Sequence, residues 1–167
     1  MSDRTGTDAQ AIFEVEYALD APTGPDQTPY EDKWPGISAV IRARDEEEVI
    51  ELSVSSLLGI VDEIVVVDNG SNDRTVDRIG RVARENDTAT QVRVLSYDVP
   101  ISRCGTDHAA TDSEDPRSLV AFYNWTFSHA RYRQSVKWDA DMVATRFGRD
   151  LLSRLRRDTT EPMVISF

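Results

Sequence analysis

From residue 37 onward, the chain alternates short apolar runs with segments whose apolar residues recur at helical spacing. The apolar runs are ISAVIR, DEIVVVDN, QVRVLS, SVKWDAD and MVISF. DEIVVVDN contains the consecutive apolar residues IVVV, whereas a strand with one wet face would alternate apolar and polar residues. Strands that are apolar on both faces are typical of a parallel sheet covered by helices on either side. The sequence therefore predicts an α/β fold with a mainly parallel sheet and helices on both faces.

Helix-end signals stand between the apolar runs. A capping-box spacing marks the start of the first helix, a glycine marks its end, and an Asp-Pro pair precedes a later helix. A further helix is expected over FGRDLLSRLRRD. The residues expected at these helix ends are Asp45 and Glu48, Gly59, and Asp115 with Pro116.

Residues 1–36 differ from the rest of the chain and are expected to form a leader rather than part of the core. The leader ends in a Pro/Gly/Asp-rich linker that runs into KWPG. Within it, the stretch AIFEVEYAL alternates apolar and polar residues and predicts an added edge strand. The apolar positions of that stretch are Phe13, Val15, Tyr17 and Leu19. Residues 37–167 are then expected to form one α/β domain, incomplete at its C-terminal end.

The charge and cysteine content exclude several classes of protein. With 30 acidic and 19 basic residues, the net charge of -11 disfavours nucleic acid and anionic membranes as partners. Cys104 is the only cysteine, so no intramolecular disulfide forms and a reducing compartment is expected. No secretory signal and no apolar run of about 18 residues is evident. We therefore expect a cytoplasmic protein with no integral membrane segment in this chain.

Polar motifs follow three of the predicted strands, where parallel sheets bind ligands. They are RARDE, DNGSND and DAD, after strands at 37–42, 62–68 and 135–139. We expect these strands to be neighbours and the motifs to meet at one edge, with the polar stretch 98–115 passing over that edge as a lid that is mobile without ligand. Neither common glycine-rich phosphate-binding loop is present, so any phosphate is held by other groups.

Asp139 and Asp141 stand one residue apart at the end of the predicted strand 135–139. In an extended segment, residues i and i+2 point the same way, so their carboxylates are expected side by side. Two such charges raise each other's pKa unless a cation lies between them. A divalent cation such as Mg²⁺ or Mn²⁺ fits this pattern, because it takes one or two carboxylates and completes its shell with phosphates and water. The alternative is a solvated turn at the strand end.

Three segments together resemble the N-terminal, nucleotide-binding part of a family 2 glycosyltransferase. They are ISAVIRARDEEEVI, DEIVVVDNGSNDRT and KWDADM, within residues 37–155. The resemblance implies a Rossmann-like GT-A fold. It also implies an inverting enzyme that transfers sugar from a nucleotide-diphospho-sugar donor to an acceptor, which the sequence does not identify. A divalent metal, Mn²⁺ or Mg²⁺, would assist the departing diphosphate.

The resemblance also implies roles for individual residues. Arg42 and Arg44 lie where the family lines its nucleobase pocket, and Asn69 lies where the family commonly has an aspartate that reads the base. Asp139 would contact the ribose or the sugar, and Asp141 would bind the metal together with Asp139. The remaining predicted nucleotide-sugar-binding residues are Asp45 and Asp68.

Asp68 also has a structural interpretation, which it shares with three residues that follow it. Side-chain oxygens in a turn or at a helix start satisfy free backbone N–H groups. The residues read in this way are Asp68, Ser71, Asp73 and Thr75.

The general base that an inverting glycosyltransferase needs is not identified in this sequence. We expect it beyond Phe167 and expect residues 1–167 alone not to transfer sugar. A second hypothesis is therefore a non-catalytic nucleotide-sugar-binding fragment or degenerate relative. A nucleotidyltransferase is disfavoured, because RARDEEE lacks the glycine-rich basic loop that such an enzyme would place after its first strand.

Overall fold

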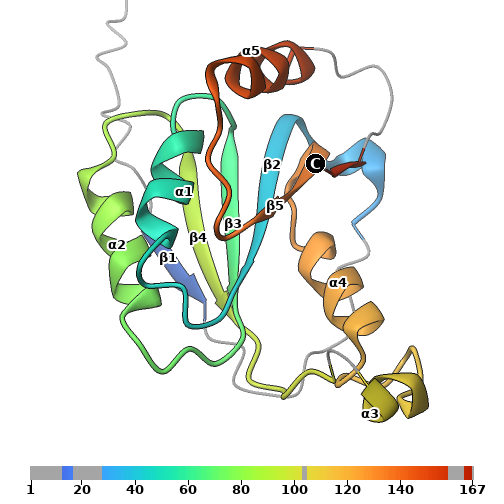
Figure 1. Cartoon of the computed structure of the whole chain (residues 1–167). Helices are drawn as coiled ribbons and strands as arrows, with labels where there is room; N and C mark the ends of the chain where they lie inside the picture. The colour runs from blue at the N-terminus through green and yellow to red at the C-terminus, as the bar shows by residue number, and fades with distance from the viewer. Residues whose placement is uncertain (1–12, 17–27, 103–104, 158–163, 167) are drawn as a thin grey trace, which may run out of the picture.

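The strands form one parallel sheet. The structure, a computed structural model, describes residues 13–16, 28–102, 105–157 and 164–166. In this part of the chain, six strands pair in the order β1-β4-β3-β2-β5-β6, and every neighbouring pair is parallel (Figure 1). The strands are β1 (Phe13–Glu16), β2 (Trp34–Ala43), β3 (Glu63–Asp68), β4 (Gln91–Ser96), β5 (Tyr132–Asp139) and β6 (Val164–Ser166). The predicted parallel sheet is confirmed.

Helices cover both faces of the sheet, as predicted. Apolar residues of α1, α2 and α5 share one core cluster with the sheet, whereas those of α4 belong to a second cluster on the other face. Gly59, with φ of 77°, follows the end of α1 as expected for a C-terminal glycine. The helices are α1 (Ile50–Leu57), α2 (Thr75–Glu85), α3 (Gly105–Ala110), α4 (Leu119–Ser128), α5 (Arg146–Leu155) and a 3₁₀ turn (Tyr30–Asp32).

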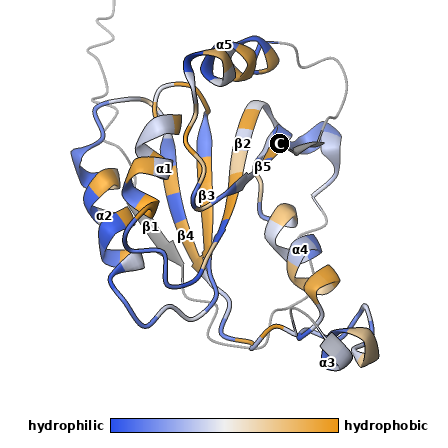
Figure 2. Ribbon diagram, viewed as in Figure 1, coloured by the Kyte–Doolittle hydropathy of each residue, from blue (hydrophilic) through white to orange (hydrophobic). Residues whose placement is uncertain are grey.

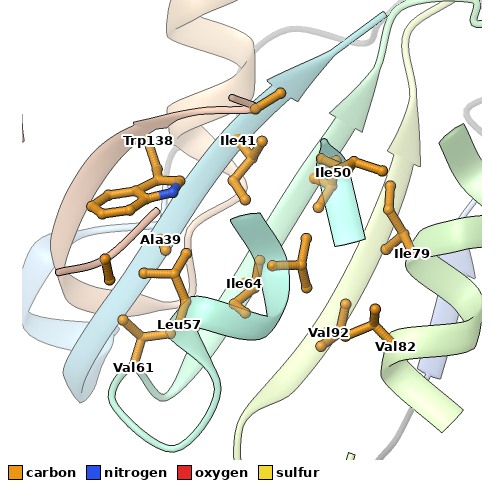
Figure 3. Close-up of a cluster of buried hydrophobic side chains, with 14 of the residues drawn as sticks. Ala39, Ile41, Ile50, Leu57, Val61, Ile64, Ile79, Val82, Val92 and Trp138 are labelled. Atoms are coloured by element: carbon orange, nitrogen blue, oxygen red, sulfur yellow. The ribbon is translucent and has the colours of Figure 1, made fainter. Parts of the chain in front are cut away.

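The core explains why β3 carries consecutive apolar residues without alternation. Every residue of β3 is buried, with Ile64 and Val66 facing α1 and α2 and Val65 and Val67 facing α4. Figure 2 shows the apolar residues gathered along the strands and on the helix sides that face them. Figure 3 shows how side chains from α1 and α2 meet those of the central strands. Each fully buried Val or Ile contributes about 1.5–3 kcal/mol relative to an exposed one.

A buried ion pair crosses the face of the sheet that α4 covers. Glu63 is fully buried, and its Oε1 lies 2.9 Å from Nη1 of Arg93, whose side chain is 5% exposed. The other oxygen, Oε2, accepts hydrogen bonds from Ser38 Oγ at 2.7 Å and from Arg131 N at 3.0 Å. Arg93 Nη1 also donates to the carbonyl of His129 at 3.0 Å. This network ties three strands to the connection between α4 and β5.

The capping box predicted from Asp45 and Glu48 is wrong. Helix α1 begins at Ile50, and its N-cap is Val49, which makes no side-chain cap hydrogen bond. Asp45 instead has a φ of 56°, and its Oδ1 accepts a hydrogen bond from Asn72 N at 2.7 Å. A tertiary contact to the loop after β3 therefore replaces the local cap.

The prediction that Asp115 and Pro116 start a helix is also wrong. Ser118 is the N-cap of α4, and its Oγ accepts a hydrogen bond from Val120 N at 3.1 Å. Asp115 instead closes a turn, in which its Oδ1 accepts from Arg117 N at 2.8 Å. The Asp-Pro pair therefore marks the turn that precedes the helix.

The N-terminal edge strand is confirmed by β1. It pairs with β4 in parallel, with Phe13 opposite Val92 and Val15 opposite Val94. The predicted positions Tyr17 and Leu19 lie outside the described residues, as does most of the leader. The polar stretch 98–115, predicted to be a mobile lid, includes the short helix α3, and its mobility stays a prediction.

The buried ion pair generates a stability prediction. Arg93→Met leaves the Glu63 carboxylate buried without its cation and is expected to lower the free energy of unfolding by about 3–5 kcal/mol. Adding Glu63→Gln removes the uncompensated charge, so the double variant should be more stable than Arg93→Met alone. Urea unfolding measures both, with Arg84→Met on the exposed side of α2 as the control. A loss below about 1 kcal/mol for Arg93→Met would show that the pair is not needed.

Candidate functional site

The carboxyl ends of β2, β3 and β5 lie side by side. In the register of the sheet, Arg42 is opposite both Val67 and Asp139, and Ala43 is opposite Asp68. The strands run in the same direction, so the three polar loops leave the sheet on the same side, at the carboxyl ends of the strands (Figure 1). The predicted neighbourhood of the three strands and the convergence of their polar motifs are confirmed.

A cleft of about 330 Å³ opens at the carboxyl ends of these strands. It contains most of the residues predicted for the site, together with one side of α4. Asp45 and Asp68 do not line it, although both were predicted site residues. The predicted residues in the lining are Arg42, Arg44, Asn69, Asp139 and Asp141, and α4 contributes Leu119, Phe122 and Tyr123.

Arg42 is held in the cleft from two sides. Its guanidinium carbon lies 3.6 Å from the centroid of the Tyr123 ring, a stacked cation–π contact. Its Nη2 lies 3.4 Å from Asp139 Oδ1, and the Arg42 side chain is 16% exposed. The buried Nε of Arg42 has no hydrogen-bond partner among the described residues. A planar, oriented guanidinium with donor capacity to spare is suited to bind phosphate or carboxylate oxygens.

Asp139 lies between two cations. Lys137 Nζ is 3.1 Å from its Oδ1 and 3.2 Å from its Oδ2, and Arg42 approaches Oδ1. Lys137 was not among the predicted site residues. The i, i+2 spacing from Asp139 within β5 was the available signal, because alternate residues of a strand share a face.

The expected strand geometry of Asp139 and Asp141 is wrong. Strand β5 ends at Asp139, and Met142 N donates to the Asp139 carbonyl at 3.0 Å, which closes a turn. Asp141 lies exposed on this turn, so the i, i+2 alternation of a strand does not apply to the pair. Both residues still line the cleft.

The described residues contain no group of three or more His, Cys, Asp or Glu side chains placed to hold a metal ion. A protein-only metal centre is therefore not present in this part of the chain. Two carboxylates at the rim of a cleft fit a different arrangement, in which a hard cation takes one or two carboxylates and completes its shell with substrate phosphates. Asp139 and Asp141 both line the cleft.

The loops after β2 and β3 are joined by hydrogen bonds from backbone to side chain. Three consecutive backbone N–H groups, those of residues 45–47, donate to Ser71 Oγ at 2.9 Å, Thr75 Oγ1 at 2.8 Å and Asp73 Oδ2 at 3.0 Å. This confirms that side-chain oxygens in this turn satisfy backbone N–H groups. The groups that they satisfy lie mainly in the other loop, so the turn after β3 holds the loop that carries Arg44 and Glu46 against the cleft.

Charged groups strengthen this junction. The Arg74 guanidinium, hydrogen-bonded to Glu47 at 2.9 Å, lowers the pKa of Glu47 below its ordinary value. Burial raises the pKa of Asp73, but hydrogen bonds from Thr75 and Glu47 outweigh it, so the net pKa is also lowered. Both carboxylates are therefore ionised at neutral pH, when they accept these hydrogen bonds.

Asn69 is a buried clamp at the back of the cleft. Its Nδ2 donates to the carbonyls of Tyr97 at 2.7 Å and Val99 at 2.9 Å, and its backbone N donates to the Ala43 carbonyl at 2.9 Å. Both amide hydrogens are therefore committed to the segment that follows β4. An aspartate, the residue that the resembled family commonly has at this position, has no hydrogens to donate to these two carbonyls.

Asp68 supports the turn beside Asn69. Its Oδ2 accepts a hydrogen bond from Ser71 N at 3.2 Å, and its carbonyl accepts one from Tyr97 N at 2.8 Å. Its Oδ1 is buried without a hydrogen-bond partner among the described residues. The interpretation of Asp68 as a turn residue is confirmed, and its direct role in ligand binding stays a prediction.

The fold and the edge site together define an α/β protein with a polar site at the carboxyl ends of parallel strands. Within that class, residues 38–97 match the family described as Glycosyl transferase family 2. The predicted resemblance to family 2 glycosyltransferases is confirmed over this segment. Asp139 and Asp141 lie outside it. The predicted site residues inside it are Arg42, Arg44, Asp45, Asp68 and Asn69.

Two solved structures illustrate the similarity of this chain to known proteins. One is glucosyl-3-phosphoglycerate synthase from Mycobacterium tuberculosis in complex with Mn²⁺, UDP and glucosyl-3-phosphoglycerate, at 27% identity over 64% of this chain and 34% of that chain, with a TM-score of 0.42. Another is S. aureus TarS 1-349, at 17% identity over 71% of this chain and 30% of that chain, with a TM-score of 0.45.

This chain spans about a third of the length of these two proteins. The search of curated proteins returned no match.

The Asn69 clamp generates a second prediction. Asn69→Asp should place a carboxylate against two carbonyl oxygens and lower the free energy of unfolding by about 2 kcal/mol or more, because two hydrogen bonds are lost in a buried position. Urea unfolding measures the change. The control is Asn72→Asp in the exposed part of the same turn, which should stay within about 0.5 kcal/mol of the native chain. Equal stabilities of the two variants would contradict the clamp.

Proposed function

We propose that this chain is the nucleotide-sugar-binding part of a family 2 glycosyltransferase with a GT-A-type fold, and that its cleft binds the nucleoside diphosphate of the donor. The arrangement of Arg42 carries the proposal. The guanidinium is stacked on Tyr123, turned toward Asp139 and left with an unpartnered Nε, at the strand edge where parallel sheets bind ligands. In a protein of net charge -11, such a local cation offsets the general repulsion of a diphosphate.

The other walls of the cleft suit a nucleoside. Leu119, Phe122 and Tyr123 supply an apolar and aromatic side, while Asn69 and Arg44 lie on the polar side. Sites for small ligands commonly combine such an apolar wall with a few oriented polar groups. We assign the base to the region between Arg44 and Asn69, and the ribose or sugar to Asp139.

Asp139 and Asp141 would hold a divalent cation, Mn²⁺ or Mg²⁺, together with the diphosphate. When bound, such a cation stabilises the negative charge of the departing diphosphate as a Lewis acid. The residues of the chain supply the rest of the site: Arg42 binds phosphate oxygens, and the turn after β5 places Asp141 at the rim. The match to the glycosyltransferase family supports this assignment for the segment that carries Arg42.

The reaction would be sugar transfer with inversion. An acceptor hydroxyl attacks the anomeric carbon, the bond from that carbon to the diphosphate breaks, and a general base takes the hydroxyl proton. We assign no general base to the described residues. A nucleotide-sugar-binding module without transferase activity is therefore the second candidate. Release of nucleoside diphosphate from a sugar nucleotide in the presence of acceptors would favour the enzyme, whereas persistent binding without release would favour the module.

Location in the cytoplasm is also proposed, on the basis of the single cysteine and the acidic composition. Within the described residues, every helix is too short or too polar to span a membrane.

Calorimetric titration tests the proposed site. UDP and GDP should bind in the presence of Mn²⁺ and should lose most of their affinity when EDTA removes it, because the acidic chain then lacks the divalent charge that offsets the diphosphate beside Arg42 and Arg44. Asp141→Ala should abolish the metal-dependent part of binding. Because Asp141 is exposed, the free energy of unfolding should stay within about 0.5 kcal/mol of the native value.

Asp150→Ala on the exposed side of α5 is the matched control and should bind like the native chain. The same affinity with Mn²⁺, with EDTA and in the Asp141→Ala variant would contradict the metal role. No detectable binding of either nucleotide under any condition would contradict the proposed function itself.

A further inference from the structure

Lys137 is placed to control Asp139 rather than to line the cleft. Its Nζ reaches both oxygens of the Asp139 carboxylate, at 3.1 and 3.2 Å, from two residues earlier in β5. Its side chain is 25% exposed, and it is one of only two lysines in the chain. The other, Lys33, donates to the Ala130 carbonyl and lies before β2 rather than at the site. A scarce residue type therefore contacts the carboxylate on which the proposed ligand site depends.

The two cations around Asp139 oppose the binding of a metal to the chain alone. A divalent cation that binds Asp139 must displace or tolerate the positive charges of Lys137 and Arg42, whose nitrogens lie 3.1 and 3.4 Å from Asp139 Oδ1. Like charges this close disfavour each other, even where solvent weakens the interaction. Asp141, which is exposed on its turn, offers a single carboxylate and is by itself a weak ligand.

A diphosphate changes this balance through Arg42. Arg42 lines the cleft, has an unpartnered Nε and holds only one oxygen of Asp139, at 3.4 Å. Phosphate oxygens are strong acceptors for a guanidinium, so Arg42 can turn its donors to them and release that oxygen. The added negative charge also favours a second cation in the cleft. Lys137 stays paired with the Asp139 carboxylate from its place in β5 and preserves the orientation of that carboxylate.

We propose that Lys137 is a positioning residue that keeps the Asp139 carboxylate ion-paired and unavailable to a metal until the nucleotide is bound. The nucleoside diphosphate then binds before the divalent cation. The proposal rests on the proposed function for the identity of the nucleotide. Its first element, the neutralisation of Asp139 by Lys137, applies to the ligand-free chain and can be tested without any nucleotide. The coupling between nucleotide and metal is reciprocal. A substitution of Lys137 therefore changes the affinity for the metal directly, and it changes the effect of the nucleotide on that affinity indirectly.

The test measures Mn²⁺ binding to the full chain by electron paramagnetic resonance of the free ion, first without nucleotide. The native chain should bind Mn²⁺ weakly. Lys137→Met should bind it about tenfold more tightly, because one competing positive charge is removed. Lys137→Arg keeps the cation and should behave like the native chain. Lys137→Met with Asp139→Asn should return to weak binding, which assigns the gain to this carboxylate.

The same titration with saturating UDP measures how much bound UDP changes the affinity for Mn²⁺. In the native chain, UDP should increase the affinity for Mn²⁺, and in Lys137→Met the increase should be smaller, since Asp139 is already available. Thermal unfolding of each variant shows whether the fold is kept. A purely structural role for Lys137 would change the unfolding temperature and leave the dependence of Mn²⁺ binding on UDP as it is in the native chain.

Two results would overturn the inference: equal Mn²⁺ affinities of the native chain and Lys137→Met without nucleotide, or equal effects of UDP in both. Failure of the proposed function has a different signature. In that case, calorimetry would detect no UDP binding to the native chain, whereas the comparison of Lys137→Met with Lys137→Arg without nucleotide would still report on Asp139.

Discussion

The parallel register between β2 and β5 is the constraint on which the site depends. It places Arg42 opposite Asp139 at the end of both strands, and α4 covers that position with Tyr123. A shift of one residue would turn the Arg42 side chain to the other face of the sheet, toward α1. The cation, the carboxylate and the aromatic ring meet because hydrogen bonds of the sheet fix where each strand ends.

Two polar networks keep that register and the loops around it. The buried Glu63–Arg93 pair joins β3 to β4 and, through Ser38, to β2, so the central strands share one set of satisfied charges. At the carboxyl edge, the hydrogen bonds from residues 45–47 to the turn after β3 fix the rim of the cleft. Several arginine and lysine side chains of this acidic chain thus orient carboxylates.

The sequence was sufficient to predict the architecture, because buried strands leave short apolar runs and amphipathic helices leave apolar residues at helical spacing, and tertiary contacts rarely reverse either pattern. It was also sufficient to place Arg42, Asn69 and Asp139 at one edge, since parallel strands end on the same side. Predictions failed where a distant segment competes for a local group. Asp45 bonds to the loop after β3 instead of capping α1, and a turn after Asp139 removes the expected strand geometry. The clamp by Asn69 and the contact from Lys137 depend on atoms that sequence spacing does not specify.

The most direct test of the account is the map of backbone amide shifts by nuclear magnetic resonance, with the full chain titrated with UDP in the presence of Mg²⁺. The account predicts the largest shifts at residues 42–46, 69, 119–123 and 139–141, which come from four separate segments and meet only at the cleft. Residues near Trp34 and Tyr132, at the opposite ends of the same strands, should not shift. Shifts that gather at that opposite edge, or none at concentrations of UDP in the millimolar range, would contradict the assignment of the site.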